Sequence, residues 1–180
     1  MSALGQINRV KHVFNKELLI TIINSLVFSK LFYCSSVWST TSEGNIKKLQ
    51  SVQNFAARII GGLRKYDHVT PILKELQWIP VKKHLFYRDA VLAFKCMNGL
   101  APNYLSSLFT TREAVSRRTT RQSDQLNLPL FTSVKGQKSF KYRIAKLWNE
   151  LPPDIKLCGS ISVFKFNLKK ELLRQLRMEQ

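Results

Sequence analysis

The chain has 180 residues, and its 29 lysines and arginines outnumber 11 aspartates and glutamates, giving a formal net charge of +18 and a pI of about 10.2. Hydrophobic residues make up 44% of the chain and aromatic residues 11%, which argues against a disordered chain and supplies a core for one domain or two small ones. Basic residues exceed acidic ones in both halves. The composition therefore favours a folded protein with a polyanionic partner, above all nucleic acid, with a membrane surface or an acidic protein as alternatives.

The cysteines and the apolar stretches exclude two further classes of protein. Cys34, Cys96 and Cys158 are too far apart for a disulfide framework or a short-spaced zinc site, which indicates a reducing intracellular compartment. Residues 1–9 are too polar for a signal peptide, so we expect no secretion. The long stretch 18–38 is interrupted by polar residues, so we expect no membrane span.

The first half of the chain predicts two long helices. Asn15 is expected to cap a helix over about 16–33, and apolar residues nearly encircle it, which is typical of a central helix. Ser42 precedes an amphipathic helix over 43–60, which two glycines end.

Three more helices are expected in the middle of the chain. Thr70 as a cap and Pro71 at the first helical position predict a short helix through Leu76. A helix over 81–98 stops before a glycine, and 102–109 forms another short one.

The amino-acid composition changes after residue 110, in the last third of the chain. Residues 110–125 are rich in Thr, Ser, Arg and Gln, so we expect a solvated loop and a domain boundary. Residues 125–131 fit a short edge strand or extended segment. A helix over 139–149 is halted by two prolines, and Ser160 or Ser162 caps the last helix. The apolar stripe of that last helix consists of Phe164, Leu168, Leu172 and Leu176.

Cationic and hydrogen-bonding side chains recur along these elements and predict contacts with phosphates. On the helix over 43–60 they fall at heptad-like spacing opposite the apolar side, although an ordinary solvated face has the same pattern. Residues 117–121 combine arginines and threonines in an open segment, which also suits a flexible basic linker. The predicted nucleic-acid-binding residues are Lys47, Lys48, Ser51, Asn54, Arg58, Lys82, Lys83, Arg117, Arg118, Arg121, Lys138, Lys141, Arg143 and Lys146.

Aromatic residues near these cations could serve either of two roles, base stacking or core packing. Phe140, Tyr142 and Trp148 could stack on bases. The helical spacing of Phe140 and Trp148 with Ile144 and Leu147 favours a place in the core instead.

The sequence carries no pattern typical of an enzyme. The three histidines lie far apart, and P-loop, GxSxG, GxGxxG and HExxH motifs are missing. Two-metal phosphoryl transfer requires clustered carboxylates, whereas Glu150 and Asp154 fit surface or capping roles. We therefore predict no catalytic residues, no metal, no cofactor and no small-molecule substrate.

Five blocks of sequence, in order, carry a resemblance to a known family. The blocks are Leu31-Phe-Tyr-Cys-Ser-Ser-Val-Trp38, Leu49-Gln-Ser-Val-Gln-Asn-Phe-Ala-Ala-Arg-Ile-Ile-Gly61, Leu76-Gln-Trp-Ile-Pro80, Asn98-Gly-Leu-Ala-Pro-Asn-Tyr-Leu105, and Ser139-Phe140 with Ala145-Lys-Leu-Trp-Asn-Glu-Leu-Pro152. Together they cover nearly the whole chain and resemble the C-terminal region of LINE-type, non-LTR retrotransposon reverse transcriptases. Phe164-Lys165 followed by Leu168 also fits.

The resemblance implies a mainly α fold, with a helical thumb-like bundle followed by a smaller helical post-thumb region containing at most one or two short strands. The expected ranges are 1–110 for the thumb-like region, 111–137 for a basic linker and 138–180 for the post-thumb region. These parts grip the template-primer duplex in such polymerases, whereas the palm aspartates and the endonuclease have no counterpart here. We therefore expect no DNA synthesis by this chain and, by family, a nuclear location, with the cytoplasm as the alternative.

Three functional hypotheses follow from the sequence. The first is a non-catalytic binder of RNA, an RNA–DNA hybrid or DNA that contacts backbone phosphates. The second is a protein interaction module that docks on a polymerase palm or on a second copy of itself. The third is a decayed fragment without a selected function.

Overall fold

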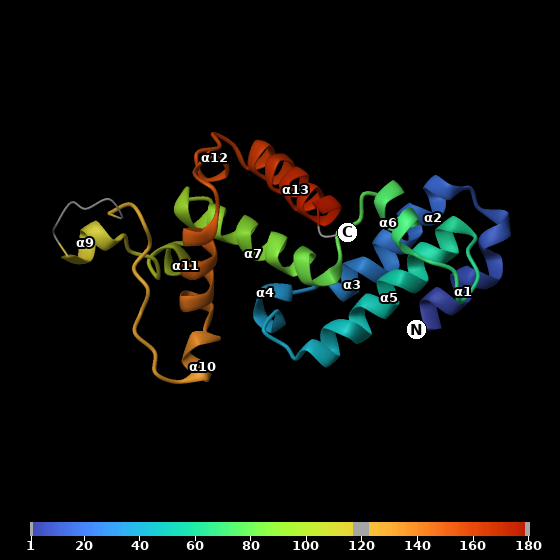
Figure 1. The fold of residues 1–180 in the computed structure, drawn as a ribbon, viewed down its shortest axis with the longest axis horizontal. Coiled ribbons are helices and arrows are strands. Elements are labelled where there is room, and N and C mark those ends of the chain that lie inside the picture. The colour runs from blue at the N-terminus through green and yellow to red at the C-terminus, as the bar shows by residue number, and fades with distance from the viewer. Residues whose placement is uncertain (1, 117–122, 179–180) are drawn as a thin grey trace. The chain divides into compact units, whose positions relative to one another are not determined.

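The computed structural model describes residues 2–116 and 123–178 and is all-helical, which confirms the predicted mainly α class (Figure 1). Helices account for 70% of the chain, and no strand occurs among the described residues. No helix in these two ranges combines the length and apolar composition that would carry it across a membrane.

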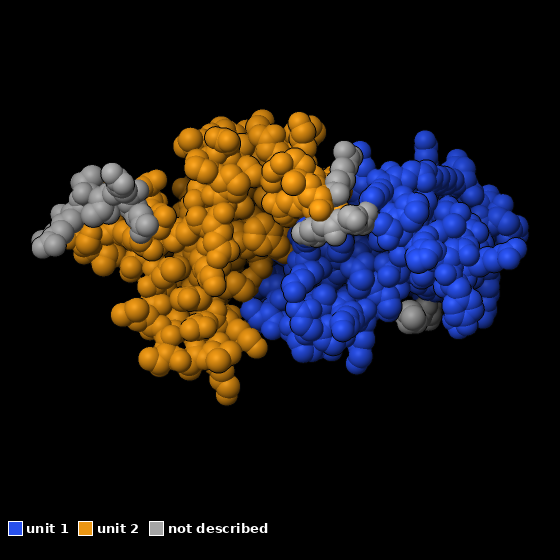
Figure 2. All heavy atoms as spheres, in the orientation of Figure 1, with its two compact units in different colours: residues 1–85 blue, residues 86–180 orange. Residues whose placement is uncertain are grey.

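The chain divides into two compact units, residues 1–85 and residues 86–180, coloured separately in Figure 2. The division falls inside a continuous helix, α7 (Val81–Met97), and not in the polar segment after residue 110. The predicted ranges 1–110, 111–137 and 138–180 stay a prediction.

Unit 1 is a helical bundle. Its helices are α1 (Ser2–Val10), η1 (Lys11–Val13), α2 (Lys16–Ile23), the π-helical η2 (Asn24–Phe28), α3 (Ser29–Leu31), α4 (Ser35–Trp38), α5 (Glu43–Gly61) and α6 (Thr70–Glu75). The sequence analysis missed α1, although Leu4 and Ile7 lie one turn apart on it and are buried. They pack in one cluster with residues of α2 and α5, so tertiary contacts stabilise a helix whose sequence is otherwise polar.

The predicted helix over 16–33 begins at the expected residue. Asn15 Oδ1 accepts a hydrogen bond from the backbone N of Leu18 at 2.8 Å, as an N-cap should. The helix is not a uniform α-helix, because η2 inserts one π-helical turn before α3.

The helix predicted over 43–60 is confirmed as α5. Ser42 Oγ accepts from the backbone N of Asn45 at 3.4 Å, and Gly62 ends the helix with a left-handed φ of 63°. Gly61 relieves a tight contact, since a Cβ there would lie 3.0 Å from Cγ1 of Ile72 on α6 and would displace that side chain. Helices α5 and α6 can approach each other closely for this reason.

The predicted cap of α6 was wrong by one residue. Thr70 is the first helical residue and Val69 holds the cap position, without a side-chain cap hydrogen bond. At the other end Gln77 adopts a left-handed φ of 51°, and the backbone N of Trp78 donates to Leu73 O at 2.9 Å. This is a Schellman-type helix end that glycine would adopt at lower cost.

Two glutamines of α5 hold the start of α7. Gln53 is buried and its Nε2 donates to Ile79 O at 3.0 Å. Gln50 Oε1 accepts from the backbone N of Val81 at 2.8 Å, which caps the first turn of α7. The turn 79–81 is thereby fixed to α5 inside unit 1.

Unit 2 contains most of α7 and the remaining helices. These are α8 (Asn103–Ser106), α9 (Arg112–Ser116), α10 (Val134–Gln137), α11 (Phe140–Glu150), α12 (Pro153–Lys156) and α13 (Ile161–Met178). Two expectations need correction, since α8 is shorter than the predicted 102–109, and α9 is helical within the range expected to be a loop. The predicted halt of α11 before the two prolines is confirmed, and Ser139 caps it.

The segment 125–131 is extended but is not a strand. It contributes one isolated antiparallel bridge, between Thr111 and Leu126. On its other side Asn149 completes the pairing, because its Nδ2 donates to Leu126 O and its Oδ1 accepts from Leu126 N, both at 2.9 Å. One side chain from α11 therefore satisfies a peptide edge that a neighbouring strand would otherwise satisfy.

Aromatic rings form the core of unit 2. The Phe94 and Phe164 ring centroids are 4.4 Å apart, and Trp148 stacks on Phe164 at 6.5 Å. Trp148 is buried, as the sequence predicted, and Phe164, Leu168 and Leu172 form the buried stripe of α13. Ser160 Oγ accepts from the backbone N of Val163 at 3.3 Å, which makes Ser160 the cap of that helix.

Candidate nucleic-acid interface

The N-terminal half of α5 presents three of the predicted residues to solvent. Lys47, Lys48 and Ser51 are exposed. The hydroxyl of Ser51 donates to Lys48 O at 2.7 Å, so it remains available only as an acceptor. Lys47 and Lys48 are therefore the side chains of α5 best placed to neutralise phosphates.

The other two predicted residues of α5 serve the fold. Asn54 and Arg58 are half-buried, and Asn54 Oδ1 accepts from Gln50 Nε2 at 2.8 Å. Arg58 Nη2 donates to Asp67 O at 3.2 Å, and the Asp67 carboxylate accepts from the backbone N of Arg64 at 2.7 Å. Arg58 thus ties the loop after α5 back to the helix, a role that the predicted cationic stripe did not anticipate.

Lys82 at the start of α7 forms an ion pair with Glu43 at the start of α5, and both side chains are exposed. The hydrogen bond from Lys82 lowers the pKa of Glu43, and the charges of Lys82 and Lys47 lower it further. Lys47 and Lys82 therefore lie around one carboxylate, which compensates part of their charge. Lys83 is half-buried beside them in the sequence.

In unit 2, Lys138, Lys141 and Lys146 are exposed on and just before α11. Arg143 differs from them, because its side chain is only 18% exposed and its guanidinium forms an ion pair with Asp89 of α7, whose side chain is 5% exposed. The prediction grouped Arg143 with the surface cations, but the structure assigns it to the interior of unit 2. Arg117, Arg118 and Arg121 lie outside the described residues.

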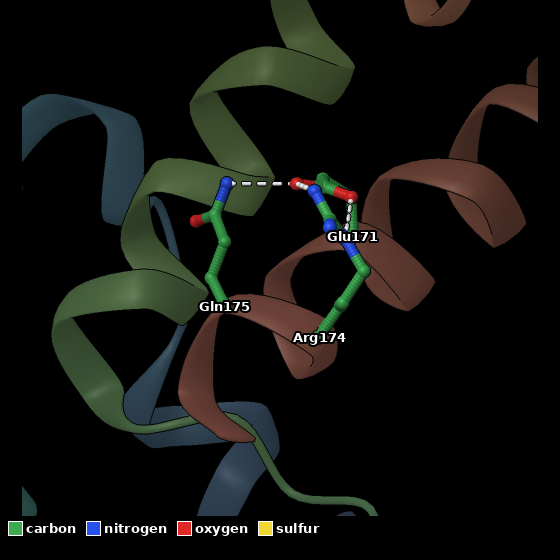
Figure 3. Close-up of polar contacts among 3 residues, drawn as sticks. All are labelled: Glu171, Arg174 and Gln175. Carbon is green, nitrogen blue, oxygen red and sulfur yellow. Dashed lines mark hydrogen bonds and ion pairs between the residues drawn. The ribbon is translucent and has the colours of Figure 1, made fainter. Parts of the chain in front are cut away.

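The sequence analysis missed one cationic surface. Lys165, Lys169 and Lys170 are exposed on α13, where the prediction considered only the apolar stripe. Their sequence spacing, one or two residues after the core positions Phe164 and Leu168, could have identified them. Arg174, one turn further on, forms an ion pair with Glu171 of the same helix. Its Nε and Nη2 donate to Glu171 Oε2 and Oε1, both at 2.8 Å (Figure 3).

The hydrogen bonds among Glu171, Arg174 and Gln175 change the pKa values of Glu171 and Arg174. Hydrogen bonding from Arg174, helped by a 3.1 Å hydrogen bond from Gln175 Nε2, lowers the pKa of Glu171. The same pair raises the pKa of Arg174. Arg174 therefore stabilises the last turns of α13 and contributes less to the cationic surface than the three lysines.

The described residues contain no group of three or more His, Cys, Asp and Glu that could hold a metal ion. His84 stacks on Phe32 with centroids 3.9 Å apart. Burial raises the pKa of the Cys96 thiol, which disfavours the reactive thiolate.

No protein-family model, no curated protein and no solved structure matches the chain.

Proposed function

We propose that the chain is a non-catalytic nucleic-acid-binding fragment of a retrotransposon RNA-directed DNA polymerase. It grips RNA, an RNA–DNA hybrid or DNA through backbone phosphates in the nucleus, with a thumb-like region over 1–110 and a post-thumb region over 138–180. The resemblance described above and the charge support the assignment.

The observation that supports the binding function is the number of lysines that remain exposed to solvent, while several of the few acidic side chains are held in ion pairs. In the described residues Glu43, Glu75, Asp89 and Glu171 are held in ion pairs with basic side chains. Lys47 and Lys48 in unit 1, and Lys138, Lys141 and Lys146 in unit 2, remain exposed on a chain with a net charge of +18. Such surfaces bind phosphates without reading sequence.

Replacing Lys47 and Lys48 together with glutamine is expected to weaken binding to an RNA–DNA hybrid and to flatten its salt dependence. Each lost phosphate contact lowers the log–log salt slope by about 0.7–0.9, so the double variant loses about 1.4–1.8. Fluorescence anisotropy across a salt series measures both quantities.

The matched control is Lys65→Gln with Lys74→Gln, which removes the same charge from exposed positions of unit 1 outside α5. It is expected to change the slope less. Equal losses in both variants would show that net charge, and not the α5 surface, determines binding. A wild-type chain that binds none of the three nucleic acids would overturn the proposed function.

The non-catalytic assignment has its own test. With template, primer, nucleotides and magnesium, the chain is expected to extend no primer, because two-metal phosphoryl transfer requires clustered carboxylates. A denaturing gel of the labelled primer measures extension, and a catalytically competent reverse transcriptase in the same buffer serves as the control. Clear extension by the chain would contradict the assignment.

A protein interaction module is the second candidate. Unit 1 leaves several large apolar side chains exposed, among them Leu26, Tyr33 and Val37. Sedimentation velocity of the chain without nucleic acid tests the self-pairing form of this candidate, since a module that pairs with itself sediments as a dimer, whereas the nucleic-acid binder sediments as a monomer.

A further inference from the structure

Helix α13 has a second apolar feature besides its buried stripe. Phe164 is fully buried at 0% exposure, but Phe166, two residues later, is 68% exposed. Because successive residues of a helix are 100° apart, the Phe166 ring projects away from the side that packs on the core. Val163, one turn before it, is also exposed.

Three lysines lie within four residues of Phe166 on α13. Lys169 and Lys170 follow Phe166 by three and four residues, which places them on the same face of the helix one turn further on. Side chains on a helix lean toward its N-terminus, so both lysines extend back toward the ring. Lys165 is exposed beside it in the sequence.

The charge of this face has one sign. The first ten residues of α13, 161–170, contain three lysines and no acidic residue. A single exposed aromatic residue is common on protein surfaces. An exposed ring among three exposed lysines is the combination with which proteins hold unpaired bases, because the ring stacks on a base while the cations hold adjacent phosphates.

We propose that Phe166, with Lys165, Lys169 and Lys170, forms a stacking site for single-stranded nucleic acid on α13. The inference rests on the proposed nucleic-acid-binding function and extends it to a surface outside the predicted residues. A single strand fits this site and a duplex does not, because only an unpaired base can leave its neighbours and stack on the ring. Phosphates on either side of that base lie within reach of the lysines.

Phe166→Ala is expected to weaken binding of a fluorescein-labelled oligodeoxythymidylate about 10-fold, within the range measured for base–aromatic stacking. Binding of the RNA–DNA hybrid stays at the wild-type level, and the salt slope is unchanged because no charge is lost. Phe166→Trp is expected to retain binding to the single strand. Lys169→Gln with Lys170→Gln instead lowers the salt slope.

Tyr104→Ala is the matched control, since Tyr104 is an aromatic residue of unit 2 that is 71% exposed and has no lysine within one helical turn. It should leave single-strand binding unchanged. All variants are compared by circular dichroism, and the full chain is used throughout.

Two outcomes would overturn the inference alone. Phe166→Ala could bind the single strand as tightly as the wild type while the hybrid still binds with its normal salt slope. Alternatively, Phe166→Ala could lower binding to phosphatidylserine vesicles and leave the oligonucleotide unaffected, which would assign α13 to a membrane surface. A wild-type chain that binds neither nucleic acid would instead contradict the proposed function.

Discussion

Replacing Asp89 with alanine is expected to lower the free energy of unfolding of unit 2 by about 3–5 kcal/mol. Asp89 and Arg143 form an ion pair whose side chains are 5% and 18% exposed, so removing the carboxylate leaves the guanidinium without its counter-charge in a largely dry environment. Hydrogen exchange of the amides of α7 and α11, together with urea denaturation, measures the loss.

The double variant Asp89→Leu with Arg143→Met is the control. It removes both charges and fills the site with apolar side chains, and replacing a buried ion pair by hydrophobic residues is often neutral or stabilising. If the double variant is as unstable as Asp89→Ala, the residues contribute through packing and not through their charges. If Asp89→Ala unfolds no more readily than the wild type, the pair is solvated and Arg143 returns to the list of surface cations.

The buried pair also affects how binding experiments are interpreted. Weaker nucleic-acid binding by Arg143→Ala would follow from a destabilised unit 2 without any contact between Arg143 and phosphate. Lys141 is exposed on the same helix, so Lys141→Ala tests α11 as a binding surface without that complication.

Phe164→Ala is expected to cost unit 2 about 3–5 kcal/mol, the usual range for truncating a buried phenylalanine. The ring lies between Phe94 and Trp148, with centroid separations of 4.4 Å and 6.5 Å, so its loss opens a cavity and removes two aromatic contacts. Urea denaturation followed by circular dichroism measures the change.

Phe166→Ala on the same helix is the matched control, because it removes the same ring from an exposed position. Surface substitutions usually change stability by less than about 0.5 kcal/mol. Similar losses from both variants would mean that Phe166 is covered in solution, which would also contradict its assignment as a stacking site.

Helix starts were predictable because their signals are local. Asn15 and Ser42 each accept a hydrogen bond from the backbone three residues on, so a short stretch of sequence contains the whole interaction. Helix α1 could not be predicted in this way, because its stability depends on residues of α2 and α5 that lie far along the chain.

The candidate site was predictable only in part, for a related reason. Lys47 and Lys48 follow from the face of α5 on which they lie. Arg143 could not be distinguished from them, since its partner Asp89 is 54 residues away in the sequence. A pattern of charges locates basic residues but does not show which of them the fold has already paired.

The sequence blocks that carry the family resemblance are joined by contacts within the fold. Gln53 of one block donates to Ile79 O in the next, and Gln50 accepts from the backbone N of Val81, directly after that block. Arg58 secures the loop after its own helix. Gln50, Gln53 and Arg58 are therefore explained by the contacts that they make within unit 1.

The pairing of Asn149 with Leu126 also bears on aggregation. Residues 125–131 alternate leucines in an extended conformation, which is the pattern that recruits strands from other molecules when an edge is open. Here one edge of Leu126 faces the bridge with Thr111 and the other is occupied by the Asn149 amide, while Pro129 lacks a backbone donor. A concentrated solution of so basic a chain is thereby protected, at this segment, from growth into intermolecular β-structure.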